Sequence, residues 1–175
     1  MTDAGRAAFE KFDPALLPAN NCQSPGLPSI AMTPNLQLWE FADGQLKITH
    51  EYFSTERTVH FDPQKPANLK ETHLGYATAS LDDNTLTITT TALAPSWGGL
   101  SRNAPSSNAR IVTERYTLSE DGQSITGTLT IEDKNFLQRT IELPLRLRRA
   151  DAGTELVLFP CSIEASQRHL DQPQP

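Results

Sequence analysis

The sequence predicts an all-β protein: an antiparallel meander of about eight to ten strands closed into a barrel, with a short N-terminal helix and arm. Three observations lead to this class. Runs of alternating apolar and polar residues recur along the chain, turn-forming residues separate them, and only 37% of the 175 residues are hydrophobic. Such a composition is typical of sheets that expose one face to water.

The first expected element is a helix over residues 4–12, where alanines favour helical structure. Asp3 is a candidate N-cap, and Asp13-Pro14 would end the helix. Residues 14–34 are rich in Pro, Asn and Ser, so we expect an arm that Cys22 could fasten to the body.

From residue 35 onward the pattern has a period of two. Asn, Asp and Gly tolerate positive φ, so they mark hairpin turns at residues 43–44, 82–84, 121–122 and 151–153. A meander of this length must curl, and closing it removes its edges. A two-sheet sandwich is the alternative. The expected strands are 36–41, 45–53, 57–61, 75–81, 85–93, 110–118, 124–132, 136–148 and 155–159.

Three segments are expected along the chain: a helix and arm over 1–34, a barrel domain over 35–161 and a polar tail over 162–175. Two connections, 62–72 and 94–108, are long for hairpins. The second contains Trp97-Gly98-Gly99, which favours a lid over a plain surface excursion.

Charge and motifs narrow the function classes. The formal net charge of −6 argues against a nucleic-acid partner, and no run of about 18 apolar residues predicts a membrane span. No common catalytic or cofactor motif occurs, so no cofactor or metal is expected. Metal binding by His60 and His73 would lack a usual ligand spacing, and His169 lies in the polar tail.

Two cysteines, Cys22 and Cys161, lie near opposite ends of the chain. They are either two buried thiols or a disulfide that joins the arm to the last strand. A disulfide would indicate an oxidising compartment. The first residues contain no apolar leader, so the protein is either cytosolic or exported after loss of a leader.

Charged residues inside the expected strands are the most unusual feature. His50, Tyr52, Arg57 and Glu114 each share a strand face with apolar residues, so we expect them to point inward. A buried arginine needs a carboxylate, with Glu114 expected and Glu51 as substitute. The cluster is either a structural salt bridge or a catalytic set. In the catalytic set, Glu114 or a histidine would move protons, and Tyr52 or Arg57 would stabilise an oxyanion.

Several segments resemble a family of exported bacterial proteins, itself uncharacterised, from Ala4 to Cys161. The resemblance implies export with signal cleavage, supports a bridge between the cysteines, and adds His60 and Arg115 as positions to test. Residues 79–84 lack the family's Trp, and residues 105–107 lack its His. The matching segments are Phe12-Asp13-Pro14, Cys22–Pro28, Arg57–Asp62, Leu74–Leu86, Val112–Tyr116, Ile131–Asp133 and Cys161.

The leading expectation is a periplasmic or secreted, lipocalin-like barrel that binds an apolar, ring-containing small molecule. Cofactor-independent acid–base chemistry of the lyase or isomerase type would follow. A non-catalytic carrier is the first alternative, and a structural envelope protein without a pocket is the second. The arm would cover one mouth and leave the Trp97 loop and the Arg57–Glu114 region at the other. The catalytic candidates are Arg57, Glu114, His50, Tyr52 and His60, and the ligand-binding candidates are Trp97, Tyr76, Arg115 and His73.

Overall fold

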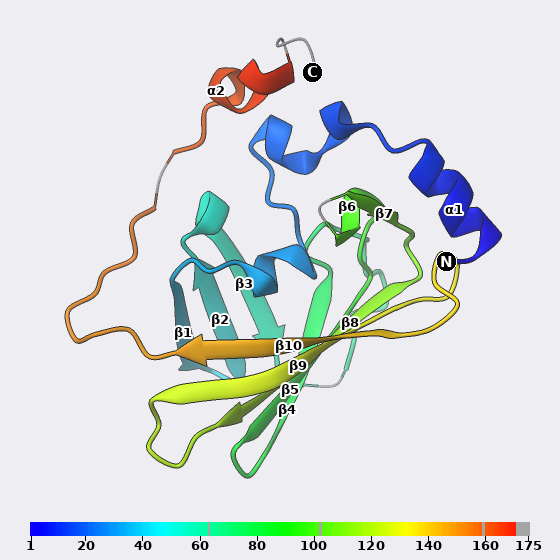
Figure 1. Cartoon of the computed structure of the whole chain (residues 1–175). Coiled ribbons are helices and arrows are strands. Elements are labelled where there is room, and N and C mark those ends of the chain that lie inside the picture. Colours follow the sequence, from blue (N-terminus) through cyan, green and yellow to red (C-terminus); the bar gives the residue numbers. More distant parts are fainter. Residues whose placement is uncertain (63, 102, 159, 171–175) are drawn as a thin grey trace.

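The computed structural model describes residues 1–62, 64–101, 103–158 and 160–170. One curled eight-stranded sheet dominates it, and a two-stranded sheet lies at one end (Figure 1). The order in the large sheet is β1-β2-β3-β4-β5-β8-β9-β10. Its strands are β1 (Gln37–Ala42), β2 (Gln45–His50), β3 (Thr55–His60), β4 (Tyr76–Asp82), β5 (Thr85–Thr91), β8 (Arg110–Leu118), β9 (Ser124–Asp133) and β10 (Ile141–Arg148).

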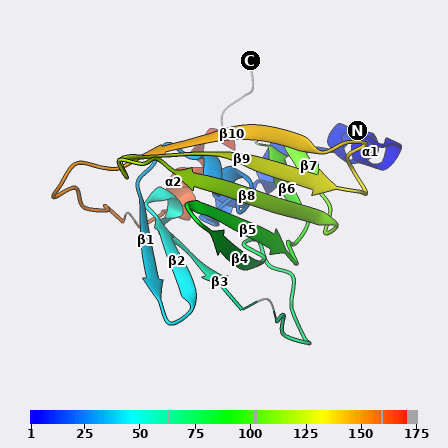
Figure 2. The same cartoon turned by 90° about the horizontal axis from the view of Figure 1, so that it is seen from below.

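The all-β class is confirmed, but the closed antiparallel barrel is not. The edge strands β1 and β10 do not pair with each other in the described sheet, so it forms an open half-barrel (Figure 2). In addition, β3 and β4 are parallel, with Val59 beside Ala77. Parallel neighbours require a long connection, and β4 begins 16 residues after the end of β3, at Tyr76.

Alternation along the strands explains the core. Each strand places every second side chain inside the curl, and the inward apolar residues of neighbouring strands lie opposite one another. Ile88 faces Glu114, and Leu129 lies on the other side of Glu114. Polar side chains are therefore buried in a predominantly aliphatic interior that includes Leu46, Ile48, Val59, Ile88, Val112, Leu129 and Ile131.

The N-terminal segment contains α1 (Asp3–Glu10), followed by short 3-10 turns η1 (Pro14–Leu16), η2 (Pro18–Asn21) and η3 (Ser29–Met32). The cap of α1 is Thr2, whose hydroxyl accepts a 3.0 Å hydrogen bond from the Gly5 amide. The expected cap, Asp3, instead lies in the first turn. A carboxylate there interacts favourably with the helix dipole.

Three expected strands differ from the structure. The strand expected over 136–148 begins only at Ile141, because residues 136–140 form turns and bends. β2 stops at His50, and Tyr52 belongs to the turn η4 (Tyr52–Ser54), where Phe53 has a positive φ of 56°. Tyr52 therefore does not continue the inward face of β2. Residues 155–158 form no strand, and residue 159 lies outside the described ranges.

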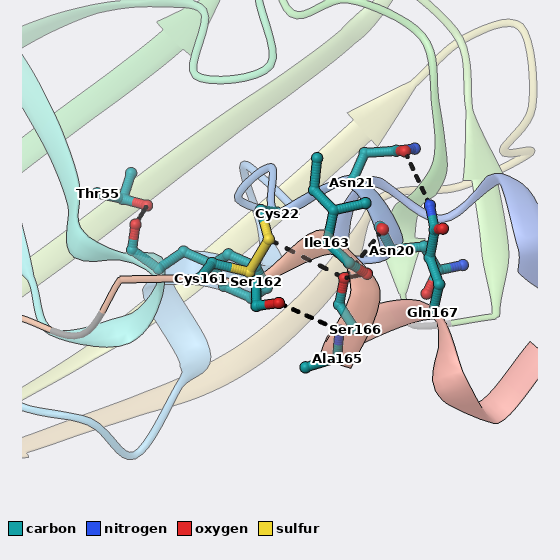
Figure 3. Close-up of a disulfide and its surroundings, with 11 residues drawn as sticks. Asn20, Asn21, Cys22, Thr55, Cys161, Ser162, Ile163, Ala165, Ser166 and Gln167 are labelled. Atoms are coloured by element: carbon teal, nitrogen blue, oxygen red, sulfur yellow. Dashed lines mark hydrogen bonds between the residues drawn. A yellow bond between two sulfur atoms is a disulfide. The ribbon is translucent and has the colours of Figure 1, made fainter.

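The missing last strand has a physical reason. After β10 the chain must reach Cys161, which is bonded to Cys22 of the arm (Figure 3). The bridge therefore joins the arm to the segment before α2 (Ile163–Gln167), not to the last strand. Ser166 adds a 3.0 Å hydrogen bond from its hydroxyl to the Asn20 carbonyl. α2 is followed by η5 (Arg168–Leu170).

The disulfide itself is confirmed, and it is compatible with an extracellular or periplasmic location. Within the described ranges, none of the helices has the length and apolar character needed to cross a membrane.

Candidate functional site: a buried ion pair and an open groove

Arg57 and Glu114 form a two-point ion pair inside the half-barrel. Arg57 Nη1 donates to Glu114 Oε1 at 3.1 Å, and Nη2 donates to Oε2 at 2.6 Å. Both side chains are almost completely buried, at 3% and 0% exposed. Because β4 and β5 separate their strands in the sheet, the pair spans the curl. The expected pairing is confirmed. The substitute, Glu51, instead accepts a hydrogen bond from the Val157 amide.

Tyr116 completes this cluster. Its hydroxyl donates a 2.8 Å hydrogen bond to Glu114 Oε1, and the two residues are two positions apart on β8. Burial, together with the charge of Glu114, raises the pKa of Tyr116, so the phenol stays protonated. Burial lowers the pKa of Arg57, but the adjacent Glu114 outweighs it and raises that pKa. Tyr116 is not among the site residues predicted from the sequence, although its spacing of two from Glu114 puts both side chains on one face of β8.

His50 lies beside the ion pair and is 1% exposed. It shares the inward face of β2 with Ile48, which is opposite Arg57 in the register. Burial, reinforced by the Arg57 charge, lowers its pKa to about 4, so the ring is neutral near pH 7. Within the described residues, neither ring nitrogen has a hydrogen-bond partner.

The remaining catalytic candidates lie elsewhere. Tyr52 packs edge-on against Phe53, with ring centres 4.7 Å apart. His60 stacks on Tyr76 at 4.8 Å. Both stacked residues alternate with the inward Val59 and Ala77, so they lie on the outer face of the sheet.

The other ligand-binding candidates are also dispersed. Arg115 is exposed on the outer face of β8. His73 lies against the arm, where its Nδ1 is 3.5 Å from Gln23 Nε2, and burial lowers its pKa. Trp97 packs edge-on against Phe12, with ring centres 6.4 Å apart.

The expected lid is instead a hairpin. Residues 94–108 contain β6 (Ser96–Ser101) and β7 (Ala104–Ser106), which pair with each other. The arm lies over this hairpin (Figure 1), and Phe12 contacts Trp97. The arm and the Trp97 loop therefore occupy the same end of the molecule, and the expectation that they lie at opposite mouths is wrong.

A second polar cluster, not anticipated from the sequence, holds that hairpin to the large sheet. Arg110, 1% exposed, donates from Nη1 to the Ser106 hydroxyl and from Nη2 to the Ala94 carbonyl at 3.2 Å. Burial lowers its pKa to about 10 despite the opposing charge of Asp133. Asp133 accepts two hydrogen bonds from Ser107, at 2.7 and 2.6 Å. We interpret this cluster as structural, because its polar groups mainly satisfy one another.

A groove of about 490 Å³ opens at the seam between the edge strands. Its walls come from residues 33–37 and Trp39, from the β8–β9 turn and from the end of β10. Trp39 also packs edge-on against Tyr116, with ring centres 5.1 Å apart. Trp39 and Tyr116 thus connect the groove to the ion pair, whereas Arg57, Glu114 and His50 do not line it.

Comparison of the chain with protein-family models, with curated proteins and with solved structures finds no match in any of the three. The resemblance to an exported bacterial family therefore stays a prediction.

Proposed function

We propose that the protein binds a small apolar, ring-containing molecule in the seam groove and acts as a carrier. One observation supports this most strongly. The groove has the volume of a small-molecule site, for which about 300–1,000 Å³ is usual. Its walls include the large apolar side chains of Trp39, Leu118, Ile125 and Leu147.

Exposure of Leu118 also supports the proposal. Leu118 is 44% exposed although it lies on the inward face of β8, opposite Ile125. An inward apolar residue that stays open to solvent is what a ligand would cover, because burying apolar area is favourable.

Carriage fits the geometry better than catalysis at Glu114. One carboxylate oxygen accepts hydrogen bonds from Arg57 and Tyr116, and the other accepts one from Arg57. A general base must come within hydrogen-bonding distance of the proton that it removes. Glu114 is fully buried, and the groove does not reach it.

Cofactor-independent acid–base chemistry is the second candidate, and His50 favours it. A neutral imidazole can accept a proton, and both ring nitrogens of His50 lack partners within the described chain. His50 itself does not line the groove, although Gln37, which lies opposite it on β1, does. Loss of turnover in His50→Gln, with the groove ligand still bound, would support this candidate.

Phenylnaphthylamine, an uncharged two-ring dye that fluoresces in apolar surroundings, tests the carrier proposal. We expect micromolar binding to the wild type, and at least tenfold weaker binding to Leu118→Asp. Leu38→Asp is the matched control, because Leu38 is similarly exposed, at 47%, but points to the other face of β1. Absence of dye binding, or equal loss in both variants, would contradict the proposal. A structural envelope protein without a ligand predicts the first of these results.

We also propose where the protein is located. The disulfide supports a periplasmic or secreted protein, since such bonds persist in oxidising compartments.

A further inference from the structure

Three arginines form the only charged part of the groove wall in the described chain. Arg146 and Arg148 belong to β10, and Arg149 follows directly. We call these three residues the basic rim. Among the described residues that line the groove, none is Asp, Glu or Lys.

We infer that the groove ligand is an anion: a small apolar molecule with one carboxylate, sulfonate or similar group held by the basic rim. This inference rests on the proposed function, since it names the chemical class of the ligand for the same groove. The inference requires the ligand to carry a negative charge, which the carrier proposal alone does not require.

The guanidinium groups of the rim are available for such a ligand. The four ion pairs among the described residues use other cations, namely Arg6, Lys47, Arg57 and Arg168. All three rim residues are exposed. In a chain with a formal net charge of −6, this stretch is locally positive, and a concave surface concentrates its potential on an approaching anion.

The rim and the apolar wall meet at the edge strand β10. Leu147 belongs to the inner face of β10, and Arg146 and Arg148 alternate with it on the outer face, but all three line the groove because β10 is an edge of the sheet. The Arg149 amide donates to the Gln123 carbonyl at 2.9 Å, which fixes the end of the rim against the β8–β9 turn. One molecule could therefore contact Leu147 with its apolar part and a guanidinium with its acidic group. Guanidinium binds carboxylate and tetrahedral oxyanions such as phosphate through two parallel hydrogen bonds.

Protection of a sheet edge is the ordinary explanation for such charges. Charged side chains on an edge strand prevent pairing with other chains, and β10 is an edge. That explanation covers Arg146 and Arg148 on one face of the strand. It does not account for Arg149, which lies beyond the strand, or for the lack of carboxylates among the described residues of the groove wall.

Two dyes that share the same aromatic rings but differ in charge distinguish the contribution of the basic rim from that of the apolar wall. Anilinonaphthalene sulfonate carries a sulfonate that phenylnaphthylamine lacks. We expect the wild type to bind the sulfonate at least tenfold more tightly, and added salt to weaken only the sulfonate. The triple variant Arg146→Gln, Arg148→Gln, Arg149→Gln should lose about tenfold in sulfonate affinity and keep its affinity for the neutral dye. Arg115→Gln, on the outer face of β8, is the control and should change neither.

The outcomes distinguish the two proposals. Equal affinity for both dyes, or no effect of the triple variant, would overturn the anionic ligand but leave the carrier intact. Failure of both dyes to bind would refute the carrier. An anionic lipid headgroup could also bind to the basic rim, so binding to vesicles of phosphatidylglycerol is measured as well. Binding to vesicles without binding of the soluble sulfonate would overturn the free-acid ligand.

Discussion

Replacing Glu114 by Gln removes the negative charge from the interior and keeps the shape of the side chain. Arg57 would then be a buried cation, 3% exposed, without a counter-charge. Breaking a buried pair in this way costs about 3–5 kcal/mol of stability. For a chain of this size, that loss lowers Tm by roughly 6–20 °C.

Removing the whole cluster should cost much less. In the triple variant Arg57→Met, Glu114→Leu, Tyr116→Phe, no charge and no phenol is left without a partner. Replacing buried ion pairs by apolar residues of similar volume is often neutral. We therefore expect the triple variant to recover most of the stability that Glu114→Gln loses.

Equilibrium unfolding in urea, checked by a thermal scan, measures both effects. Glu56→Gln is the control, because it breaks the exposed 2.7 Å pair with Lys47 and should cause no resolvable loss. If Glu114→Gln were as stable as Glu56→Gln, or if the triple variant were less stable than Glu114→Gln, the reasoning would fail.

Three further perturbations test other parts of the structure. Changing both Cys22 and Cys161 to Ser opens a link across 139 residues and should cost about 2–5 kcal/mol in urea unfolding, with faster hydrogen exchange in α2; unchanged stability would contradict the tether. Because burial holds the pKa of His50 near 4, against 6.5 when unfolded, the unfolded chain binds the extra proton between these values. The free energy of unfolding should therefore fall by up to about 3 kcal/mol as the pH drops through that window. His50→Leu should remove this part of the pH dependence, and an identical slope in wild type and variant would refute it. Gly127→Ala would place a Cβ 1.8 Å from the Arg115 carbonyl and should cost about 3 kcal/mol. Gly122→Ala meets nothing within 4 Å and should cost only about 1 kcal/mol for its positive φ, so equal losses would count against the close approach.

Strand faces could be predicted because they depend only on alternation. The inward positions of His50, Arg57 and Glu114 follow from period two, and the ion pair follows because a buried arginine needs a carboxylate. These local rules do not predict whether neighbouring strands run parallel or antiparallel. The parallel β3–β4 pair depends on a connection with no periodic pattern.

The groove could not be predicted for a related reason. It exists because β1 and β10 do not meet, which is a property of the whole curl. In the sequence, Arg146 and Arg148 look like an ordinary wet face of a strand. Only the edge position of β10 brings them to a groove. Residues 155–158 illustrate the converse, since their strand-like composition is overruled by the attachment of Cys161 to the arm.

Mapping the bound sulfonate dye on the protein tests the central claim most directly. In an amide NMR titration with anilinonaphthalene sulfonate, we predict that the largest shifts cluster at residues 36–39, 118–125 and 146–150, around the groove. Shifts concentrated on the outer face near Arg115 or beside the disulfide, or no shifts at all, would contradict a ligand site at the open seam.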